Sequence, residues 1–213
     1  MEQNNLAQIR IDYGKEKLTK SVCLDDPLEQ FNKWMEQAIK AEVNEPTAMC
    51  LSTVDTSMMP NSRIVLLKGV DHGFQFFTNY SSTKGKEIQA NPKASLNFFW
   101  PELERQVRIQ GELRELDIQA SDEYFNSRPK GSKIGAWVSR QSNEIENREV
   151  LEKREIEEKQ KWDSEEPKRP VFWGGYRLIP VNFEFWQGRA SRLHDRIKYD
   201  KIKNRWKKVR LEP

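Results

Sequence analysis

The strongest constraint on the fold is a succession of short apolar runs in the first half of the chain. They are rich in Val, Ile, Leu, Thr and Phe and occupy residues 47–54, 62–70, 74–79, 93–100 and 105–116. Turn-forming sequence at residues 55–60 and 71–73 separates the first three runs. Because short consecutive strands joined by tight turns pair with their neighbours, the pattern predicts an antiparallel sheet or a small barrel.

A capped helix is expected before these strands. Asp26 holds the position of its N-cap, because Pro27 then takes the first helical position and Glu29 the third, from which a carboxylate reaches back to the cap. Apolar residues recur at helical spacing along the segment, at Leu28, Phe31, Met35, Ala38 and Ile39. The pattern predicts an amphipathic helix that buries this face.

The rest of the chain mixes helices and strands. Three further helices are expected at residues 82–90, 117–127 and 147–162. Asp117 is the expected cap of the second, and the third has so few apolar positions that it should be exposed. Strand-like sequence returns at residues 175–187, 191–199 and 205–211. We therefore expect a β-rich α+β fold, with one domain over residues 21–213 and a mobile segment over residues 1–20.

Composition and spacing exclude several classes of protein. No apolar run approaches the roughly 18 residues of a membrane span, and residues 1–18 lack a signal-peptide core, so we expect a cytoplasmic protein with no membrane partner. The two cysteines and two histidines show neither metal-ligand nor disulfide spacing, and the common dinucleotide and P-loop motifs are absent. A net charge of +3 does not by itself indicate a nucleic-acid partner. With 36% hydrophobic residues the core is modest, and a subunit interface is expected to add burial.

Two cations bracket one of the apolar runs. Arg63 and Lys68 lie five residues apart, and on a strand this odd spacing places their side chains on opposite faces. One strand would then serve an anionic group on each of its two sides. The alternative is a pair of solvated charges at the ends of the strand.

Two further segments carry groups that bind phosphate. Ser81 to Lys84 places hydroxyls, a lysine and free backbone N–H groups at a helix N-terminus, although ordinary capping explains the same residues. Tyr124, Arg128 and Ser132 would hold a phosphomonoester through one guanidinium and two hydroxyls. The alternative for this trio is a plain helix stop before Pro129.

The most unusual segment follows the aromatic sequence around Trp186. Arg192, His194 and Arg196 alternate, so that a strand would place all three on one face. Three such groups repel one another unless they face an anion, which favours a ligand site over a structural role for His194.

The C-terminal residues 196–210 contain eight Lys or Arg, with Tyr199 and Trp206 among them. A nucleic-acid surface would fit this composition. The alternation from Lys203 to Leu211 favours an edge strand that its charges protect from further pairing.

The chain resembles the pyridoxine (pyridoxamine) 5′-phosphate oxidases. From about Arg10 to Pro213, eight motifs occur in the order seen in that family: Arg63–Lys68, Glu104–Val107, Ser127–Pro129, Ile134–Val138, Gln141–Ser142, Phe172–Tyr176, Phe185–Gly188 and Arg192–Arg196. The resemblance implies an FMN-binding split β-barrel that is a homodimer, with FMN at the subunit interface. These expectations agree with the short strands and the modest core.

The resemblance also implies roles for particular residues. FMN would be bound by Arg63, Ile64, Val65, Leu66, Leu67, Lys68, Phe77, Thr78, Thr83, Lys84, Gln106, Gln141, Ser142, Trp186 and Arg196. The substrate would be bound by Arg10, Tyr13, Lys68, Tyr124, Arg128, Ser132, Arg192, Leu193 and His194. Arg10 and Tyr13 would close over the site as a lid, and Arg192 and His194 would be the catalytic residues.

The implied reaction oxidises pyridoxine 5′-phosphate or pyridoxamine 5′-phosphate to pyridoxal 5′-phosphate, with hydride transfer from C4′ to flavin N5 and reduction of O2 to H2O2. Two positions depart from the family pattern. Thr83 stands where an arginine is common, which removes one cation from the FMN phosphate, and Glu45 replaces an aspartate. The rival functions are another split-barrel flavin reductase or oxidase, and a non-enzymatic carrier of pyridoxal 5′-phosphate or FMN.

Overall fold

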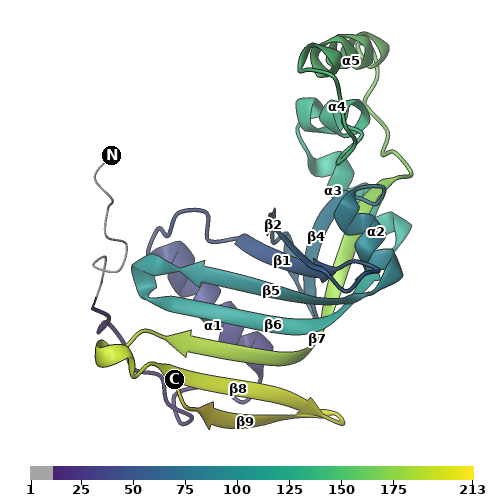
Figure 1. Ribbon diagram of the computed structural model, residues 1–213. Coiled ribbons are helices and arrows are strands. Elements are labelled where there is room, and N and C mark those ends of the chain that lie inside the picture. The colour runs from purple at the N-terminus through teal and green to yellow at the C-terminus, as the bar shows by residue number, and fades with distance from the viewer. Residues whose placement is uncertain (1–11) are drawn as a thin grey trace, which may run out of the picture. The chain divides into compact units, whose positions relative to one another are not determined.

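The computed structural model describes residues 12–213, which contain the α-helices and strands labelled in Figure 1. The helices are α1 (Pro27–Lys40), α2 (Thr83–Ala90), α3 (Ile118–Ser127), α4 (Lys130–Val138) and α5 (Glu149–Lys161). The strands are β1 (Ala48–Val54), β2 (Pro60–Leu66), β3 (Gly69–Val70), β4 (Phe74–Asn79), β5 (Lys93–Trp100), β6 (Arg105–Glu115), β7 (Trp173–Gln187), β8 (Asp195–Ile202) and β9 (Arg205–Leu211). The β-rich α+β class is confirmed.

Within the described residues, the strands form a nine-stranded sheet in the order β2-β1-β5-β6-β7-β4-β3, with β8 paired to β7 and β9 paired to β8. The chain divides into two compact units. Unit 1 contains residues 12–49, Leu96–Gln110 and Val181–Pro213, and unit 2 contains Cys50–Ser95 and Gly111–Pro180. The prediction of one domain over residues 21–213 after a mobile segment stays a prediction, and residues 1–11 of that segment lie outside the described part of the chain.

In unit 1, α1 lies against one face of the strands (Figure 1). The predicted cap is confirmed, because the Asp26 side chain accepts a hydrogen bond from the backbone N–H of Leu28. The buried face differs slightly from the predicted one: Trp34 is buried and packs edge-on against Phe185 at 5.2 Å, whereas Ile39 is 56% exposed. Each large side chain buried in this way contributes about 1.5–3 kcal/mol.

The C-terminal hairpin also belongs to unit 1. β7 pairs antiparallel with β8, so that Trp186 lies opposite Arg196, and β8 pairs with β9. In the described chain, β9 pairs only with β8, so the basic run ends in an edge strand, as its alternating charges predict.

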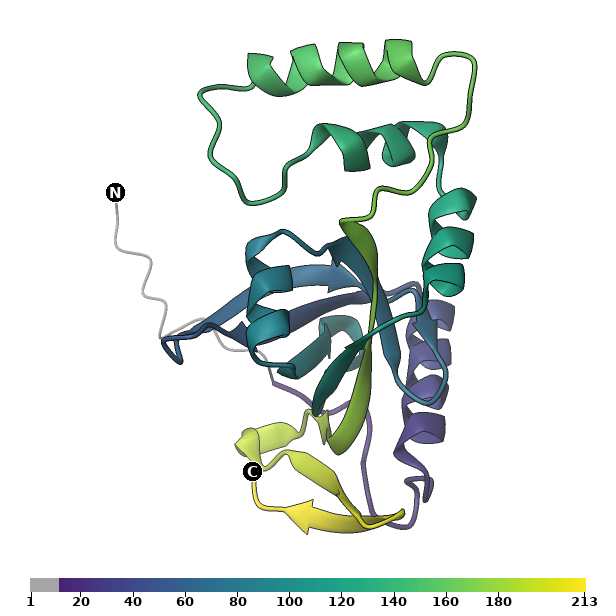
Figure 2. The ribbon, with the colours of Figure 1, turned by 90° about the vertical axis from the view of Figure 1, so that its right-hand side faces the viewer.

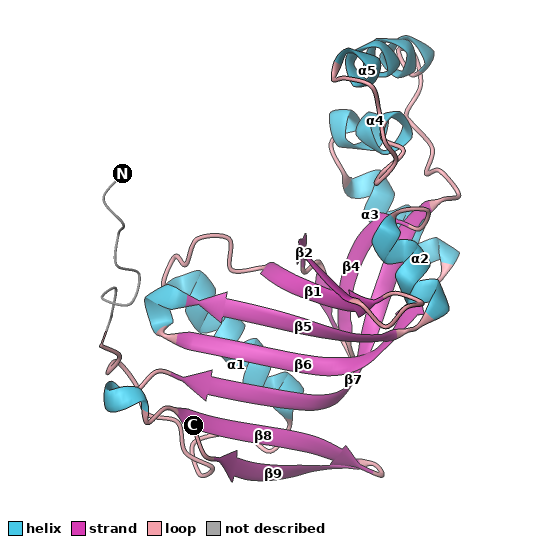
Figure 3. Ribbon diagram, viewed as in Figure 1, coloured by secondary structure: helices cyan, strands magenta, loops and turns pink. Residues whose placement is uncertain are grey.

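In unit 2, α2 follows β4 and α3 follows β6, whereas α4 and α5 come one after the other behind α3 (Figure 3). Ser82 caps α2 by accepting from the N–H of Gly85, and Asp117 caps α3 by accepting from Ala120, as predicted for Asp117. β4 pairs antiparallel with the first half of β7, and β3 pairs with β4. The predicted strand over 62–70 is wrong in extent, because β2 ends at Leu66 and the chain resumes as β3 at Gly69.

The sequence missed α4, because the segment from Pro129 to Gly131 suggested a helix stop. Pro129 instead forms the N-cap of α4, and its carbonyl accepts from the N–H groups of Ser132 and Lys133. α4 and α5 run side by side (Figure 2) around a small apolar cluster of Ile134, Val138 and Trp162. No residue of α5 is buried, which confirms the prediction that this helix is exposed.

Candidate active site

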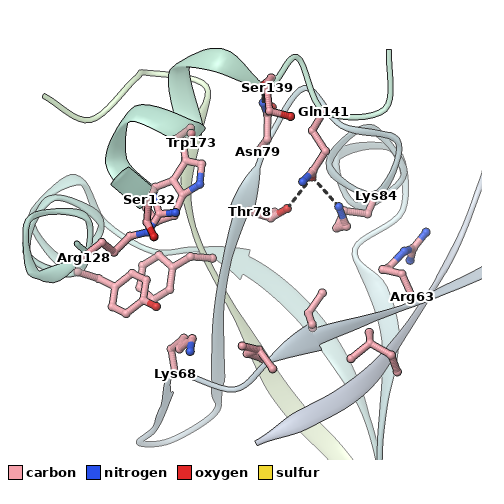
Figure 4. A pocket seen from close by; sticks show the side chains of 17 residues that line it. Arg63, Lys68, Thr78, Asn79, Lys84, Arg128, Ser132, Ser139, Gln141 and Trp173 are labelled. Carbon is pink, nitrogen blue, oxygen red and sulfur yellow. Dashed lines mark hydrogen bonds between the residues drawn. The ribbon is translucent and has the colours of Figure 1, made fainter. Parts of the chain in front are cut away.

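Unit 2 contains a cavity of about 880 Å³, which we call the unit 2 pocket (Figure 4). Many of the predicted site residues line it: Arg63, Ile64, Val65, Leu66, Lys68, Phe77, Thr78, Lys84, Tyr124, Arg128, Ser132 and Gln141. The sequence missed five other lining residues: Asn79, Gly135, Ala136, Ser139 and Trp173. The pocket combines cationic groups with apolar and aromatic walls, as sites for phosphorylated aromatic molecules do.

Arg63 and Lys68 both line this pocket, so the prediction that they lie on opposite faces of one strand is wrong. Since β2 ends at Leu66, the alternation of side chains does not extend to Lys68. The N–H of Lys68 bonds instead to the carbonyl of Gln75 at 2.8 Å, ahead of the short strand β3.

Arg63 is held in place by a buried carboxylate. Its Nη2 lies 2.9 Å from Oε2 of Glu87, whose side chain is 6% exposed. Glu87 also accepts from the Thr53 hydroxyl at 2.5 Å and from Nδ2 of Asn61 at 3.0 Å. Burial acts to raise the pKa of Glu87, but these hydrogen bonds and the guanidinium outweigh it and hold the pKa below its usual value. Glu87 is therefore an ionised counter-charge for Arg63.

Lys84, in the first turn of α2, lies beside Arg63 of β2 (Figure 4). Its Nζ donates to Oε1 of Gln141 at 2.7 Å, and the same oxygen accepts from the Thr78 hydroxyl at 3.3 Å (Figure 4). Burial, and then the positive charge of Arg63, lower the pKa of Lys84. Two cations beside a helix N-terminus form a suitable site for a phosphate.

Arg128 belongs to a different part of the pocket. Its guanidinium lies 4.6 Å from the ring centre of Trp173 and 5.5 Å from that of Phe125. Its Nη1 is buried and has no hydrogen-bond partner among residues 12–213, and burial lowers the pKa of the group. A buried charged donor without an acceptor is costly, so this position is suited to an anionic ligand.

Three aromatic rings form a parallel stack next to Arg128. Phe77 lies 3.9 Å from Tyr124 and 5.6 Å from Trp173, with interplanar angles of 17° and 13°. Gly175 permits this stack, because a β-carbon there would lie 2.7 Å from the ring of Phe77. The motif Phe172–Tyr176 was the available sequence signal for Trp173, although no role was assigned to it.

A second group of predicted residues lies in unit 1. The ring centres of Trp186 and His194 are 4.6 Å apart, and Tyr13 lies 5.7 Å from Trp186 and 5.9 Å from His194. Nδ1 of His194 accepts from the backbone N–H of Arg189 at 3.1 Å, which assigns the proton of the neutral ring to Nε2. Burial, and then the charge of Arg192, lower the pKa of His194. The ring is therefore neutral near pH 7 and presents an N–H donor.

The predicted row of Arg192, His194 and Arg196 on one strand face is wrong. β8 begins only at Asp195, and residues Ala190–Arg192 form a 3₁₀ turn in which Arg192 has a φ of 61°. This left-handed conformation breaks the two-residue period on which the prediction rested. The charge of Arg196 is balanced by a carboxylate, because its Nε donates to Oε1 of Glu184 at 2.8 Å.

The remaining predicted residues lie elsewhere. Leu67 is buried and does not line the unit 2 pocket, whereas Gln106 on β6 and the exposed Leu193 belong to unit 1. The backbone N–H of Thr83 donates to the hydroxyl of Ser142 at 3.2 Å. Arg10 lies outside the described residues.

Within residues 12–213, we find no cluster of three or more His, Cys, Asp or Glu side chains that would hold a metal ion. None of the helices in this part of the chain has the length and apolar character needed to cross a membrane.

Comparison with known proteins gives consistent matches over almost the whole chain. Residues 35–162 match the pyridoxamine 5′-phosphate oxidase family, and residues 173–213 match the pyridoxine 5′-phosphate oxidase C-terminal dimerisation region. The chain is 51% identical to proteins named pyridoxine/pyridoxamine 5′-phosphate oxidase in Cupriavidus taiwanensis and Neisseria gonorrhoeae, over 98% of its own length and 99% and 100% of theirs.

Solved structures agree. PhzG from Burkholderia lata 383, in complex with tetrahydrophenazine-1-carboxylic acid, matches with a TM-score of 0.87 and 29% identity over 93% of this chain and 98% of that one. A pyridoxamine 5′-phosphate oxidase-related, FMN-binding protein from Nostoc punctiforme shares the fold, with a TM-score of 0.70 and 17% identity over 88% of this chain and 98% of that one.

Proposed function

Because the chain belongs to the pyridoxine (pyridoxamine) 5′-phosphate oxidase family, we propose that its unit 2 pocket binds FMN and the phosphate of its substrate. The protein is an FMN-dependent oxidase that converts pyridoxine 5′-phosphate or pyridoxamine 5′-phosphate to pyridoxal 5′-phosphate. It carries the family's dimerisation region and is a homodimer. The observation that carries the proposal is that one cavity gathers residues that the resemblance assigns to both ligands.

The pocket residues fit FMN in charge and in their combination of polar and aromatic groups. Arg63, Lys84 and the N-terminus of α2 suit the FMN phosphate, with Gln141, Ser142 and Thr83 around them. The backbone of residues 64–67 together with Phe77 and Thr78 would flank the rest of the cofactor. Trp186, Arg196 and Gln106 of unit 1 remain proposed FMN ligands on the resemblance alone.

The substrate phosphate is assigned to Lys68, Tyr124, Arg128 and Ser132. The unpartnered Nη1 of Arg128 supports this assignment, because a phosphate oxygen would supply the acceptor that it lacks. The phosphate is remote from the reacting carbon, but the energy of binding it holds that carbon in place and so contributes to the rate.

FMN, when bound, supplies the redox chemistry by accepting the electrons of the substrate C4′–H bond and passing them to O2. His194, Leu193 and Arg192 are proposed to contact the substrate ring. The neutral His194 would donate from Nε2 and orient the ring, and Arg192 would polarise the substituent at C4′. Tyr13 and Arg10 are proposed to cover the site. The cytoplasmic location expected from the sequence also stays a prediction.

An anaerobic titration tests the proposal. FMN-loaded protein is mixed with pyridoxine 5′-phosphate without any nicotinamide cofactor, and the visible flavin absorbance is followed before and after air is admitted. We expect bleaching, recovery with oxygen, and formation of pyridoxal 5′-phosphate. A reductase would require the nicotinamide cofactor, and a carrier would leave the flavin spectrum oxidised throughout.

A further inference from the structure

Within unit 1, the backbone of residues 13–18 is held largely by side chains from distant parts of the sequence. Oε2 of Glu104 accepts from the N–H of Gly14 at 2.9 Å and from the N–H of Lys15 at 3.0 Å. Further along, the carbonyl of Glu16 accepts from Nη1 of Arg189 at 3.1 Å, and the N–H of Leu18 donates to Asp195 at 3.0 Å. Glu104 is therefore the anchor nearest to Tyr13.

Glu104 is itself firmly placed. It follows the turn Pro101–Leu103, is 6% exposed, and has a φ of 54°, in the left-handed region that non-glycine residues seldom adopt. Its carbonyl accepts from the N–H of Gly188 at 2.8 Å. A carboxylate this buried needs hydrogen-bond donors, and the two N–H groups of Gly14 and Lys15 supply them. Glu104 belongs to the motif Glu104–Val107, and the proposed chemistry gives it no role.

The residue next to this anchor is Tyr13, whose ring packs edge-on against Trp186 and His194. Gly188 leaves room for the ring, because a β-carbon at this position would lie 2.7 Å from Cγ of Tyr13. It would also lie 3.0 Å from Cβ of Glu104. Gly188 thus lies against both the Tyr13 ring and Glu104.

We propose that Glu104 is a positioning residue, which holds the backbone of Gly14 and Lys15 and thereby keeps the Tyr13 ring on the Trp186–His194 pair. This inference rests on the proposed roles of Tyr13 and His194 in substrate binding. Without the carboxylate, two charge-assisted hydrogen bonds are lost and the segment detaches more often. Substrate binding then weakens, while the FMN phosphate site in unit 2 is unaffected.

Limited trypsin digestion tests the anchor independently of activity, since Lys15 and Lys17 lie in the anchored segment. We expect cleavage after these lysines to be about 10-fold faster in Glu104→Ala than in the native protein, as mass spectrometry would record. Glu104→Gln keeps an oxygen acceptor and should stay within about 3-fold of the native rate. The matched control is Glu102→Ala, because the Glu102 side chain bonds only to the N–H of Asn44, at 3.4 Å, among the described contacts. Equal cleavage rates in Glu104→Ala and the native protein would overturn the proposal.

Kinetics then test whether Glu104 acts through Tyr13. In Glu104→Ala we expect KM for pyridoxine 5′-phosphate to rise about 10-fold while the Kd for FMN stays within about 2-fold. Tyr13→Ala should have a similar KM, and the double variant should be no worse than either single one. A KM in the double variant that rises by the product of the two single increases would overturn the proposal. Loss of FMN binding in both Glu104 variants would overturn it too. If the native protein does not oxidise the substrate, the proposed function fails, and the digestion still decides whether Glu104 anchors the segment.

Discussion

The cations at the two ends of the unit 2 pocket differ in whether the protein provides their partners. At the Arg63–Lys84 end, the protein supplies its own partners: Glu87 for Arg63 and Gln141 for Lys84. At the Arg128 end, the guanidinium lies over the faces of Trp173 and Phe125, and its Nη1 has no acceptor in the described part of the chain. At one end both cations thus have a protein partner, whereas at the other a buried donor has none among residues 12–213. The difference implies that removing a cation has different consequences at the two ends.

The largest expected effect is at the Arg128 end. Arg128→Ala should raise KM for pyridoxine 5′-phosphate about 100-fold, equivalent to about 2.7 kcal/mol, because a buried charge-assisted contact to the phosphate is lost. The Kd for FMN, measured by flavin fluorescence, should change less than about 2-fold. Arg128→Lys keeps the charge without the planar fork and should recover only part of the loss. A normal KM in Arg128→Ala would remove this residue from the substrate site.

Protein stability should depend more on the Arg63–Lys84 end than on the Arg128 end. Arg63→Met leaves Glu87 buried without its cation, so the free energy of unfolding of the FMN-free protein should fall by about 2 kcal/mol in urea titrations at pH 7. Replacing Glu87 by Gln in the same protein should restore part of this loss. Arg128→Met is the matched comparison and should cost less than about 0.5 kcal/mol, because it removes a buried donor that has no acceptor among residues 12–213. Similar losses at both sites would contradict the contrast between the two ends.

The Arg63–Lys84 end should also respond to pH. Burial and Arg63 lower the pKa of Lys84, and a bound phosphate would favour its protonated form. FMN should therefore bind most tightly below the lowered pKa that Lys84 has in the FMN-free protein. Its affinity should decrease, by up to about 10-fold, as the pH rises above this pKa. Fluorescence titrations of FMN from neutral to alkaline pH would measure this. Lys84→Met has no proton to lose at this position and should bind FMN more weakly, without the pH-dependent step.

The smallest expected effect concerns Thr83. Thr83→Arg restores the cation that is common in the family and should lower the Kd for FMN about 3-fold at low salt, less at high salt. Thr56→Arg adds the same charge at an exposed position outside the unit 2 pocket and controls for net charge. Equal effects of the two substitutions would show that position 83 does not contact the phosphate.

Much of the fold could be predicted because its signals are local. Asp26 and Asp117 cap helices as the sequence indicates, and turn residues separate the first strands. The failures occurred where the backbone departs from a regular period. A left-handed conformation at Arg192 breaks the alternation that placed it in a row with His194, and the end of β2 at Leu66 brings Lys68 into the pocket of Arg63.

Motifs identified the residues that line the pocket more completely than the residues that hold those side chains in place. The cations and hydroxyls could be named from the resemblance, because that pattern carries them in order. Glu87, on α2, was missed because its importance depends on contacts with Thr53, Asn61 and Arg63 of β1 and β2, which no local pattern records. Trp173 was missed because the strand was expected to begin only at residue 175 and the motif Phe172–Tyr176 assigned it no role; its ring packs in a core cluster with Phe125 and also supports Arg128.

The most direct test of the contrast between the two ends is a comparison of phosphorylated and unphosphorylated substrate. Pyridoxine 5′-phosphate and pyridoxine are each titrated anaerobically into native and Arg128→Ala protein loaded with FMN, and half-saturation is read from the flavin absorbance. Loss of the phosphate should weaken binding at least about 100-fold in the native protein and less than about 10-fold in Arg128→Ala. The same ratio in both proteins would contradict the account, because Arg128 would then have no part in binding the phosphate.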